Sequence, residues 1–344
     1  MKVLLIRAFA DSDKGGIEQS YSQLSDALKS KGYEVTEHHL VDYHGRLFNI
    51  IKILIRICLK LTNRQSPTNL AILGDIVMSR LTRQKQILSY DYVFHYSFPS
   101  EFMFRSCSGI HIGWVHTDLF LRKVPSFVDT WLSRRIRYVA VSEHVNKDLV
   151  QRGINSYFVP HHYTENFVEK KREVMYDFIF VGRFSEVKQP LKFVELLNQV
   201  KKNYNWRGTA VMVGDGPLYN EIERLLQKYD LEKNVRLTGW IPNVTSIYEL
   251  SGMLIQTSKY EGRSLVLDEG YINNCRLLIL NYPSARENCK AYEKSAYQIV
   301  EYSQMSKSMG EYLELNRDYK HAPDIKRVKD LNRLFWEKIN ILLV

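Results

Sequence analysis

The feature that most restricts the fold is an alternation of short apolar runs with helical patterns, which occurs twice along the chain. The first series begins with the apolar run 3–6, a glycine-containing loop, and a helical pattern in Tyr21, Leu24 and Leu28 that Gly32 ends. Further predicted strands of this series lie at residues 35–40, 92–96, 110–115 and 138–141. Strands that alternate with helices pair in parallel, so the pattern predicts a doubly wound α/β domain.

A polar, charged stretch at residues 164–176 interrupts this alternation and is interpreted as a linker. The alternation then restarts and includes an amphipathic helix with Leu218 and Ile222 on its apolar face, for which Pro217 is suited to the first position. The second series has predicted strands at residues 178–181, 209–213, 235–237, 253–256 and 277–280, and predicted helices at 191–200 and about 324–343. Two such halves predict two facing Rossmann-like domains, with ligands bound in a cleft at the carboxyl ends of the strands.

Composition restricts the class of protein. The chain has 344 residues, of which 45% are hydrophobic, which is enough for two cores. A net charge of +10 attracts nucleic acid, anionic lipid or phosphorylated small molecules without choosing among them. The four cysteines have neither Cys-x-x-Cys nor zinc-site spacing, so we expect reduced, buried thiols and no metal site. No signal peptide and no transmembrane run is recognised, and we expect a cytoplasmic protein.

Residues 260–269 read Tyr-Glu-Gly-Arg-Ser-Leu-Val-Leu-Asp-Glu, with Glu261 before a predicted helix and Glu269 inside it. The first turn of a helix has N–H groups without intrahelical acceptors and a partial positive charge, so it can bind phosphate. An acid on either side of that turn can accept hydrogen bonds from neutral hydroxyls. We interpret the segment as a nucleotide-sugar pocket, with sugar hydroxyls at one acid and ribose hydroxyls at the other.

Residues 178–188 are a predicted strand followed by Gly182, Arg183 and, five positions after the arginine, Lys188. An arginine at the carboxyl end of a strand points toward the cleft, and a lysine in the next loop can reach the same place. Two cations suit a diphosphate, which gains negative charge as it leaves. The alternative is an ordinary pair of surface cations; the nearby Glu261 segment favours the phosphate site.

Two glycine turns carry weaker signals. Gly15-Gly16 follows the first predicted strand, where a backbone without Cβ atoms can approach a phosphate closely or simply turn. Gly214-Asp215-Gly216 resembles the start of a dinucleotide fingerprint, but Tyr219 stands where the third glycine is needed. We therefore interpret the second turn as structural and do not expect nicotinamide binding.

The chain resembles the retaining glycosyltransferases of family 4, which have the GT-B fold. The matching motifs follow one another in the family's order along nearly the whole chain: Gly15-Gly16-Ile17-Glu18, Val181-Gly182-Arg183 with Lys188, Val213-Gly214-Asp215-Gly216-Pro217, and the Glu-x₇-Glu pair Glu261 and Glu269. In that family the glycine-arginine segment holds the donor diphosphate. The resemblance implies this role for Arg183 and Lys188, a sugar contact for Glu261, a ribose contact for Glu269 and a phosphate contact for Gly16.

The resemblance also implies a domain layout. Residues 1–165 would form the acceptor-binding domain, residues 174–323 would bind the donor, and a helix at about 324–344 would cross back onto the first domain. Retaining members of the family need no metal, and we expect no cofactor. The expected donor is a nucleoside diphosphate sugar, with a UDP-sugar favoured over a GDP-sugar.

Histidines supply the remaining site candidates. His116 ends a predicted strand, and the resemblance places it near the donor sugar and the acceptor hydroxyl, with a packed core histidine as the alternative. Asp118 is interpreted as a helix cap. His161-His162 stands where the family usually has Asn-Gly, and we interpret the pair as hinge structure rather than metal ligands.

The chain departs from the family after Glu261, where Gly-Arg-Ser replaces the usual Gly-Pro or Leu-Pro. Ser264 is predicted to cap the helix in place of the proline, and Ser264 and Leu265 begin the phosphate-binding turn. Arg263 is predicted to add a phosphate or sugar contact. Gly270 is expected to cost about 1 kcal/mol of helix stability relative to alanine. These changes leave the donor's identity open and resemble a capsule or surface-polysaccharide branch of the family.

The stretch from Leu47 to Leu61 is the membrane candidate. Its cations Lys52, Arg56 and Lys60 lie along one stripe of a predicted helix whose other positions are largely apolar. Such a helix can rest on anionic headgroups at the inner face of the cell membrane, as a peripheral contact. The alternative is a helix that packs on the first sheet with its basic edge in solvent.

These observations favour a retaining hexosyltransferase that moves a sugar from a nucleoside diphosphate to a hydroxyl of a glycan or lipid-linked glycan. Alternatives are a sugar-nucleotide epimerase on the same scaffold and a non-catalytic glycan-binding relative. Nucleic-acid binding is indicated by charge alone; the basic residues are dispersed and no nucleic-acid module is recognised. The sequence does not specify the sugar, the acceptor, the linkage or the oligomeric state.

Overall fold

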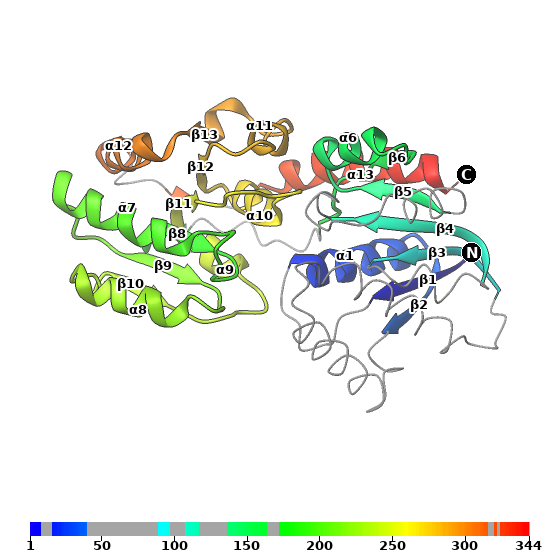
Figure 1. Ribbon diagram of the computed structural model, residues 1–344, viewed down its shortest axis with the longest axis horizontal. Coiled ribbons are helices and arrows are strands. Elements are labelled where there is room, and N and C mark those ends of the chain that lie inside the picture. Colours follow the sequence, from blue (N-terminus) through cyan, green and yellow to red (C-terminus); the bar gives the residue numbers. More distant parts are fainter. Residues whose placement is uncertain are drawn as a thin grey trace, which may run out of the picture. The chain divides into compact units, whose positions relative to one another are not determined.

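The computed structural model describes residues 1–7, 16–39, 89–96, 107–116, 136–163, 172–315, 320–321 and 324–343. The chain divides into two compact units, unit 1 with Met1–Thr164 and Asn332–Val344, and unit 2 with Glu165–Leu331. Each unit contains a six-stranded parallel sheet with helices beside it (Figure 1). The predicted class, α/β with two parallel-sheet domains, is confirmed. The predicted domain limits, 1–165 and 174–323, lie close to the borders of these units.

Unit 1 has the strand order β2-β1-β3-β4-β5-β6. Its first strand is buried on both faces, because Val3, Leu4, Leu5 and Ile6 are each at most 1% exposed. The first helix buries Tyr21, Leu24 and Leu28, the residues whose spacing predicted it. The elements are β1 Lys2–Arg7, α1 Gly16–Ser30, β2 Glu34–His39, β3 Ser89–His95, β4 Ser108–Val115, β5 Arg137–Ala140, α6 Glu143–Gln151 and β6 Ser156–Phe158.

Unit 2 has the strand order β10-β9-β8-β11-β12-β13. A two-stranded antiparallel pair, β7 Arg172–Glu173 with β14 Lys320–His321, accompanies the main sheet. The strands are β8 Tyr176–Val181, β9 Ala210–Val213, β10 Val235–Leu237, β11 Ser251–Gln256, β12 Arg276–Leu280 and β13 Tyr297–Val300. The helices are α7 Pro190–Asn203, α8 Tyr219–Lys228, α9 Thr245–Tyr248, α10 Leu265–Ile272, α11 Ala285–Asn288, the 3₁₀ turn Lys294–Ala296, α12 Tyr302–Leu315 and α13 Ile325–Leu342.

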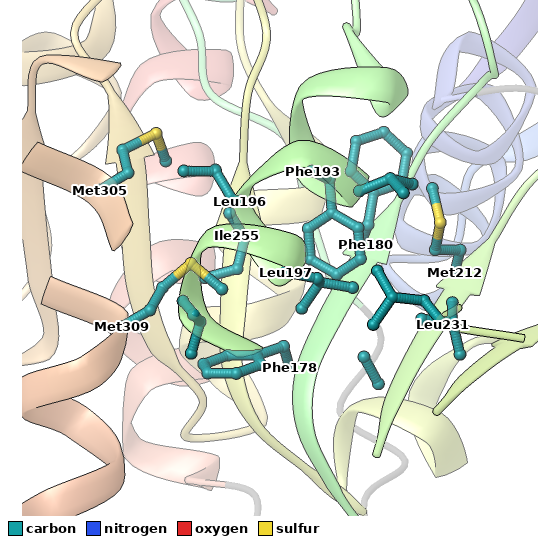
Figure 2. Close-up of a cluster of buried hydrophobic side chains, with 14 of the residues drawn as sticks. Phe178, Phe180, Phe193, Leu196, Leu197, Met212, Leu231, Ile255, Met305 and Met309 are labelled. Carbon is teal, nitrogen blue, oxygen red and sulfur yellow. The ribbon is translucent and has the colours of Figure 1, made fainter. Parts of the chain in front are cut away.

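The central strand of unit 2 separates two hydrophobic cores. Successive side chains of a strand point to opposite faces, and β8 places Phe178 and Phe180 on one face and Ile179 on the other. The first core includes α7 and α12, with Phe193 and Met309 packed beside Phe178 and Phe180 (Figure 2). The second core lies under α9 and α10. With both faces covered, the sheet leaves only its strand ends and edges for ligands.

Helix α13 contributes to both units. Its first turns bond within unit 2, where the Arg327 guanidinium donates to the backbone oxygen of Tyr271 at 2.8 Å. Its later residues Phe335, Ile339 and Leu342 are buried in the core of unit 1. The three described cysteines, Cys107, Cys275 and Cys289, are free and buried, as expected.

The sequence patterns missed several elements. Strand β6 reads Ser-Tyr-Phe and β13 reads Tyr-Gln-Ile-Val, and neither strand has a fully buried residue, because both are edge strands. Helices α6 and α12 were also not predicted. Helix α8 begins at Tyr219 with Leu218 as its N-cap, so Pro217 precedes the helix instead of occupying its first position.

Within the described part of the chain, no helix is both long enough and apolar enough to cross a bilayer. The predicted basic helix from Leu47 to Leu61 lies outside the described residues. Its contact with a membrane surface stays a prediction.

A buried histidine, His95, and a half-buried one, His111, form a hydrogen-bonded pair in the sheet of unit 1. The Nε2 atom of His111 lies 3.1 Å from the backbone oxygen of Cys107, which only accepts, so this nitrogen carries the proton. The Nδ1 atom of His111 then accepts from Nε2 of His95 at 2.9 Å. Burial lowers the pKa of His95 well below its usual value, with His111 as a second cause, and burial also lowers the pKa of His111.

We predict that acid destabilises unit 1 through this pair. Because the folded-state pKa of each histidine is lowered, protons bind preferentially to the unfolded chain as the pH falls below about 6.5. The free energy of unfolding should fall by up to about 1.4 kcal/mol per pH unit for each histidine in that range. Denaturant unfolding of unit 1 at pH 7, 6 and 5 tests this. His95→Phe with His111→Phe should flatten the dependence; an equally steep dependence in the double variant would contradict the assignment.

Candidate active site

The candidate site of unit 2 lies in the two loops that follow β8 and β11. These strands are neighbours in the sheet and run in parallel, so their carboxyl-end loops lie beside each other. Hydrogen bonds join the two loops: the hydroxyl of Thr257 donates to the backbone oxygen of Lys188 at 3.0 Å, and the Lys259 N–H donates to Val187 at 2.8 Å. The sheet topology therefore brings the glycine-arginine segment and the Glu-x₇-Glu segment together.

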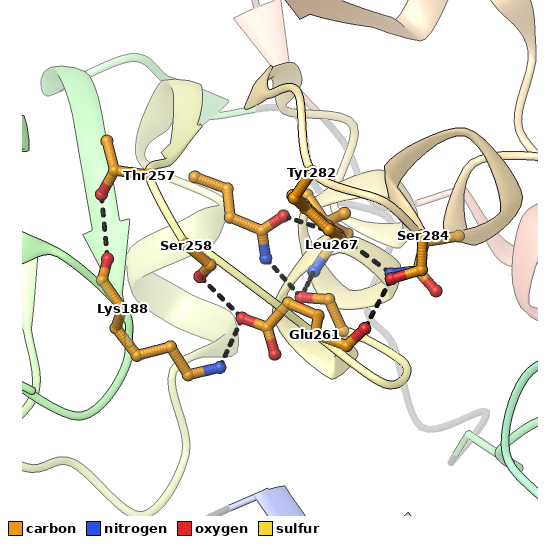
Figure 3. A network of polar contacts seen from close by, with 10 residues as sticks. Lys188, Thr257, Ser258, Glu261, Leu267, Tyr282 and Ser284 are labelled. Carbon is orange, nitrogen blue, oxygen red and sulfur yellow. Dashed lines mark hydrogen bonds and ion pairs between the residues drawn. The ribbon is translucent and has the colours of Figure 1, made fainter. Parts of the chain in front are cut away.

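Lys188 and Glu261 meet between these loops. The Nζ atom of Lys188 is 2.5 Å from Oε1 of Glu261, and the hydroxyl of Ser258 donates to the same oxygen at 2.7 Å (Figure 3). The Lys188 side chain is 27% exposed and that of Glu261 is 9% exposed. The cation and the acid are thus partly withdrawn from water, which strengthens their interaction with each other and with a charged ligand.

The backbone around Glu261 is fixed by buried polar groups. The hydroxyl of Ser284 donates to the Glu261 carbonyl at 2.5 Å (Figure 3). The side-chain amide of Gln256 donates to Ser264 Oγ at 2.6 Å and accepts from the hydroxyl of Tyr282 at 3.2 Å. Burial, with Glu261 as the next cause, raises the pKa of Tyr282 well above its usual value, so its phenol remains a donor.

Ser264 caps α10, as predicted. Its backbone is extended, and its hydroxyl accepts from the Leu267 N–H at 3.4 Å. Leu265 and Val266 are the first helical residues, and N–H groups at this position have no acceptor inside a helix. The positive end of α10 is therefore three residues from Glu261, where a phosphate site requires it.

Arg263 lies in a buried ion pair. Its Nε and Nη2 atoms donate to the two carboxylate oxygens of Asp268 at 2.9 and 2.5 Å, and the side chains are 6% and 0% exposed. The Tyr292 hydroxyl also donates to Asp268, at 2.5 Å. Burial, followed by Asp268, raises the pKa of Tyr292 well above its usual value. These contacts support a role for Arg263 in holding the loop to α10, which differs from the predicted phosphate or sugar contact.

Gly270 has a packing role that the sequence did not reveal. A Cβ atom at this position would lie 2.6 Å from Cδ2 of Leu254 and 3.0 Å from Cδ2 of Leu277. The glycine lets α10 approach β11 and β12 closely. The glycine lowers the stability of the helix, but an alanine would have to displace the side chains of Leu254 and Leu277.

Arg183 and Glu269 are the remaining predicted donor contacts of unit 2. Arg183 is exposed in the loop after β8. That loop rests on the Gly214-Asp215-Gly216 turn, where a Cβ on Gly214 would be 2.0 Å from the Gly182 oxygen and one on Gly216 would be 2.5 Å from the Phe184 oxygen. Glu269 is half-buried on α10 and accepts from the Tyr248 hydroxyl at 3.0 Å. The glycine turn is structural, as interpreted.

In unit 1 a second polar cluster lies at the carboxyl ends of the strands. His116 follows β4 and is 8% exposed; its ring stacks on that of His161, with centroids 5.9 Å apart, and lies 4.9 Å from the ring of Tyr96. Ser20 on α1 is within hydrogen-bonding distance of His161 Nδ1, at 2.7 Å, and of the Tyr96 hydroxyl, at 3.2 Å. Gly16 is the first residue of α1. Asp118 lies outside the described residues.

The sequence did not place His161 beside His116. The two histidines come from different strand ends, and their proximity arises from the order of β4, β5 and β6 in the sheet. The sequence offered one indication that His161 lies at a strand end, because it follows Pro160 shortly after β6. That strand was itself not predicted. Among the residues that the structure describes, no group of three or more His, Cys, Asp or Glu side chains has the arrangement of a metal site.

A cavity of about 400 Å³ lies elsewhere in unit 1, lined by Met1, Lys31, Gly32, Tyr33, Trp336 and Asn340. Met1 precedes β1, and Tyr33 precedes β2, so this cavity is at the amino ends of the strands. Ligands of open parallel sheets bind at the opposite, carboxyl edge. We therefore place the candidate site at the strand ends described above and not in this cavity.

Comparison with known proteins addresses the family. Residues 161–325 match the sequence model of the family described as "Glycosyl transferases group 1". The matched residues coincide closely with unit 2, Glu165–Leu331. A Campylobacter jejuni protein named "GalNAc-alpha-(1->4)-GalNAc-alpha-(1->3)-diNAcBac-PP-undecaprenol alpha-1,4-N-acetyl-D-galactosaminyltransferase" is 30% identical over 113 residues, which are 33% of this chain. The matched stretch covers only 31% of that relative's length.

Solved structures establish the GT-B fold for the whole chain. A Staphylococcus aureus TarM variant, crystallised with fondaparinux, alpha-GlcNAc-glycerol and UDP, has a TM-score of 0.68 at 10% identity, covering 100% of this chain and 97% of TarM. HepE of Anabaena, in complex with UDP and glucose, has a TM-score of 0.64 at 11% identity, covering 99% of this chain and 96% of HepE. At these identities the similarity extends to the fold alone.

We predict that Arg263→Ala destabilises unit 2 by about 3–5 kcal/mol, because it leaves the buried Asp268 carboxylate without its cation. Replacing both residues, as Arg263→Leu with Asp268→Leu, should cost less than the single change. Urea unfolding measures both. Lys307→Ala is the control, since its ion pair with Glu311 is 74% and 51% exposed and should contribute no more than about 1 kcal/mol. An Arg263→Ala loss as small as that of the control would contradict the buried-pair assignment.

Proposed function

We propose that the chain is a retaining glycosyltransferase that moves a sugar from a nucleoside diphosphate to a hydroxyl of a glycan or lipid-linked glycan in surface-polysaccharide synthesis. The observation that carries the proposal is the meeting of Lys188, Glu261 and the amino end of α10 at the strand ends of unit 2. A cation, a carboxylate and a helix N-terminus supply complementary partners for a diphosphate and for neutral hydroxyls.

The charges indicate how the donor would lie. The diphosphate would be near Lys188, Arg183 and the first turn of α10, where its growing negative charge is stabilised as the sugar departs. Glu261 already uses Oε1 to bind Lys188 and Ser258, which leaves Oε2 to accept from a sugar hydroxyl. Glu269, eight residues after Glu261 and in the second turn of α10, would accept from the ribose.

The reaction would need no enzyme nucleophile. Of the described carboxylates around this site, Asp268 is buried in its pair with Arg263, and Glu261 is held through Oε1 by Lys188 and Ser258 and is assigned through Oε2 to a sugar hydroxyl. We therefore favour attack of the acceptor hydroxyl on the face that the diphosphate leaves, with the leaving phosphate receiving the proton. His116 would orient the acceptor hydroxyl, and catalysis would proceed without a metal.

The relatives support the substrate classes. The name of the Campylobacter jejuni relative includes an undecaprenol-linked glycan, and two of the structural neighbours were crystallised with UDP. We propose a UDP-sugar as donor ahead of a GDP-sugar, and a glycan or lipid-linked glycan as acceptor.

Lys188→Ala is predicted to lower kcat by about 10²–10³-fold, and Arg183→Ala by about tenfold. Each variant removes charge that stabilises the departing diphosphate. The exposed position of Arg183 is the reason for its smaller expected effect. Steady-state transfer from a UDP-sugar measures both. Lys192→Ala, on α7 with its cation over the Tyr302 ring, is the matched control and should retain activity. Transfer rates near wild type for both site variants would refute the assignment.

Thermal unfolding distinguishes the donor base. A ligand present at 100 times its Kd stabilises the folded form by about 2.7 kcal/mol, so UDP should raise the Tm of unit 2 by several degrees and GDP by less. The same incubation with a UDP-sugar and no acceptor should leave the sugar configuration unchanged by chromatography. A sugar converted to its epimer would support the epimerase alternative instead.

A further inference from the structure

Tyr248 lies against the proposed ribose-binding acid. It is the last residue of α9, its side chain is 1% exposed, and its hydroxyl donates to Oε2 of Glu269 at 3.0 Å. The ring belongs to the core cluster that contains Leu267 and Tyr271 from α10. The acid is on the surface side of this core, and the phenol reaches it from within.

The backbone of Tyr248 is held as firmly as its ring. Its N–H donates to the Val244 oxygen at 3.1 Å, and its carbonyl accepts from the Cys275 thiol at 3.4 Å. Burial raises the pKa of Tyr248 well above its usual value, and Glu269 raises it further. The phenol is therefore protonated at neutral pH and can donate to the carboxylate.

A glutamate on a helix surface rotates freely about its last torsion angle, and binding a ligand must stop that rotation. A buried donor fixed to one carboxylate oxygen removes much of this freedom before the ligand arrives. We propose that Tyr248 is a positioning residue that holds Glu269 in the orientation that accepts the ribose hydroxyls of the donor. The inference rests on the proposed function, because it names the group that prepares Glu269 for its proposed task.

The test compares UDP with 2′,3′-dideoxy-UDP, which lacks both ribose hydroxyls, by isothermal titration of the full chain. Tyr248→Phe keeps the buried ring and removes only the hydroxyl. It should weaken UDP binding about five-fold, as expected for one hydrogen bond to a charged group, and change dideoxy-UDP binding less than two-fold. In transfer assays it should raise the KM for the UDP-sugar and leave kcat nearly unchanged, because the bond acts on binding.

Tyr302→Phe is the matched control. The Tyr302 hydroxyl donates to the Glu195 carboxylate at 2.8 Å, so this variant loses the same kind of tyrosine–glutamate bond between α12 and α7. It should bind UDP and dideoxy-UDP as the wild type does. Tyr248→Phe with unchanged UDP binding would overturn the inference, and so would an equal loss for UDP and dideoxy-UDP, which would indicate a general structural effect.

Glu269→Gln separates failure of this inference from failure of the proposed function. If Glu269 accepts the ribose hydroxyls, this variant should weaken UDP binding about tenfold and bring it close to that of dideoxy-UDP. A Glu269→Gln protein that still prefers UDP as strongly as the wild type would refute the ribose assignment, and the inference with it. The role of Tyr248 alone would be refuted by a different pair of results. In that case Glu269→Gln would lose the preference for UDP over dideoxy-UDP, and Tyr248→Phe would keep it.

Discussion

The ion pair between Lys188 and Glu261 is the interaction on which the candidate site depends. Burying two charges costs solvation free energy, and a pair at 2.5 Å recovers that cost only if further hydrogen bonds satisfy the charged groups. Ser258 supplies one such bond to Glu261. The pair also remains partly exposed at Lys188, so its ammonium can respond to an incoming anion. A hydrophobic replacement could pack as well but could not attract a diphosphate.

The loop that carries Glu261 is held by side chains rather than by regular secondary structure. Ser284 fixes the backbone carbonyl of Glu261, and Gln256 fixes the cap residue Ser264. The Arg263–Asp268 pair ties the loop to the helix that follows it. A loop without the family's proline would be expected to sample more conformations, and these buried bonds restrict it instead. The rigidity places the helix N-terminus and the acid at a fixed separation, which electrostatic stabilisation of a developing charge requires.

The parts that the sequence could predict are those with local causes. Apolar runs predicted the central strands, and the capping role of Ser264 followed from its position before a helical pattern. The contacts that the sequence did not reveal join residues far apart in the chain. A ligand contact is expected for Arg263 because the sequence shows a cation next to the predicted phosphate site. The sequence does not show that Asp268 is buried on α10 and pairs with this arginine. Similarly, Gly270 appeared costly until its distances to Leu254 and Leu277 were known.

The described bonds that hold the acids and the cap of the proposed donor site all come from unit 2. Lys188, Ser258 and Ser284 hold Glu261, Gln256 holds Ser264, and Tyr248 holds Glu269. The positive end of α10 is likewise a property of that helix and its cap. The proposed complementarity to a nucleoside diphosphate would therefore come from a single sheet and its loops. On this proposal, donor affinity would depend on the internal packing of unit 2, through residues such as Tyr248 and Asp268 that a ligand need not touch.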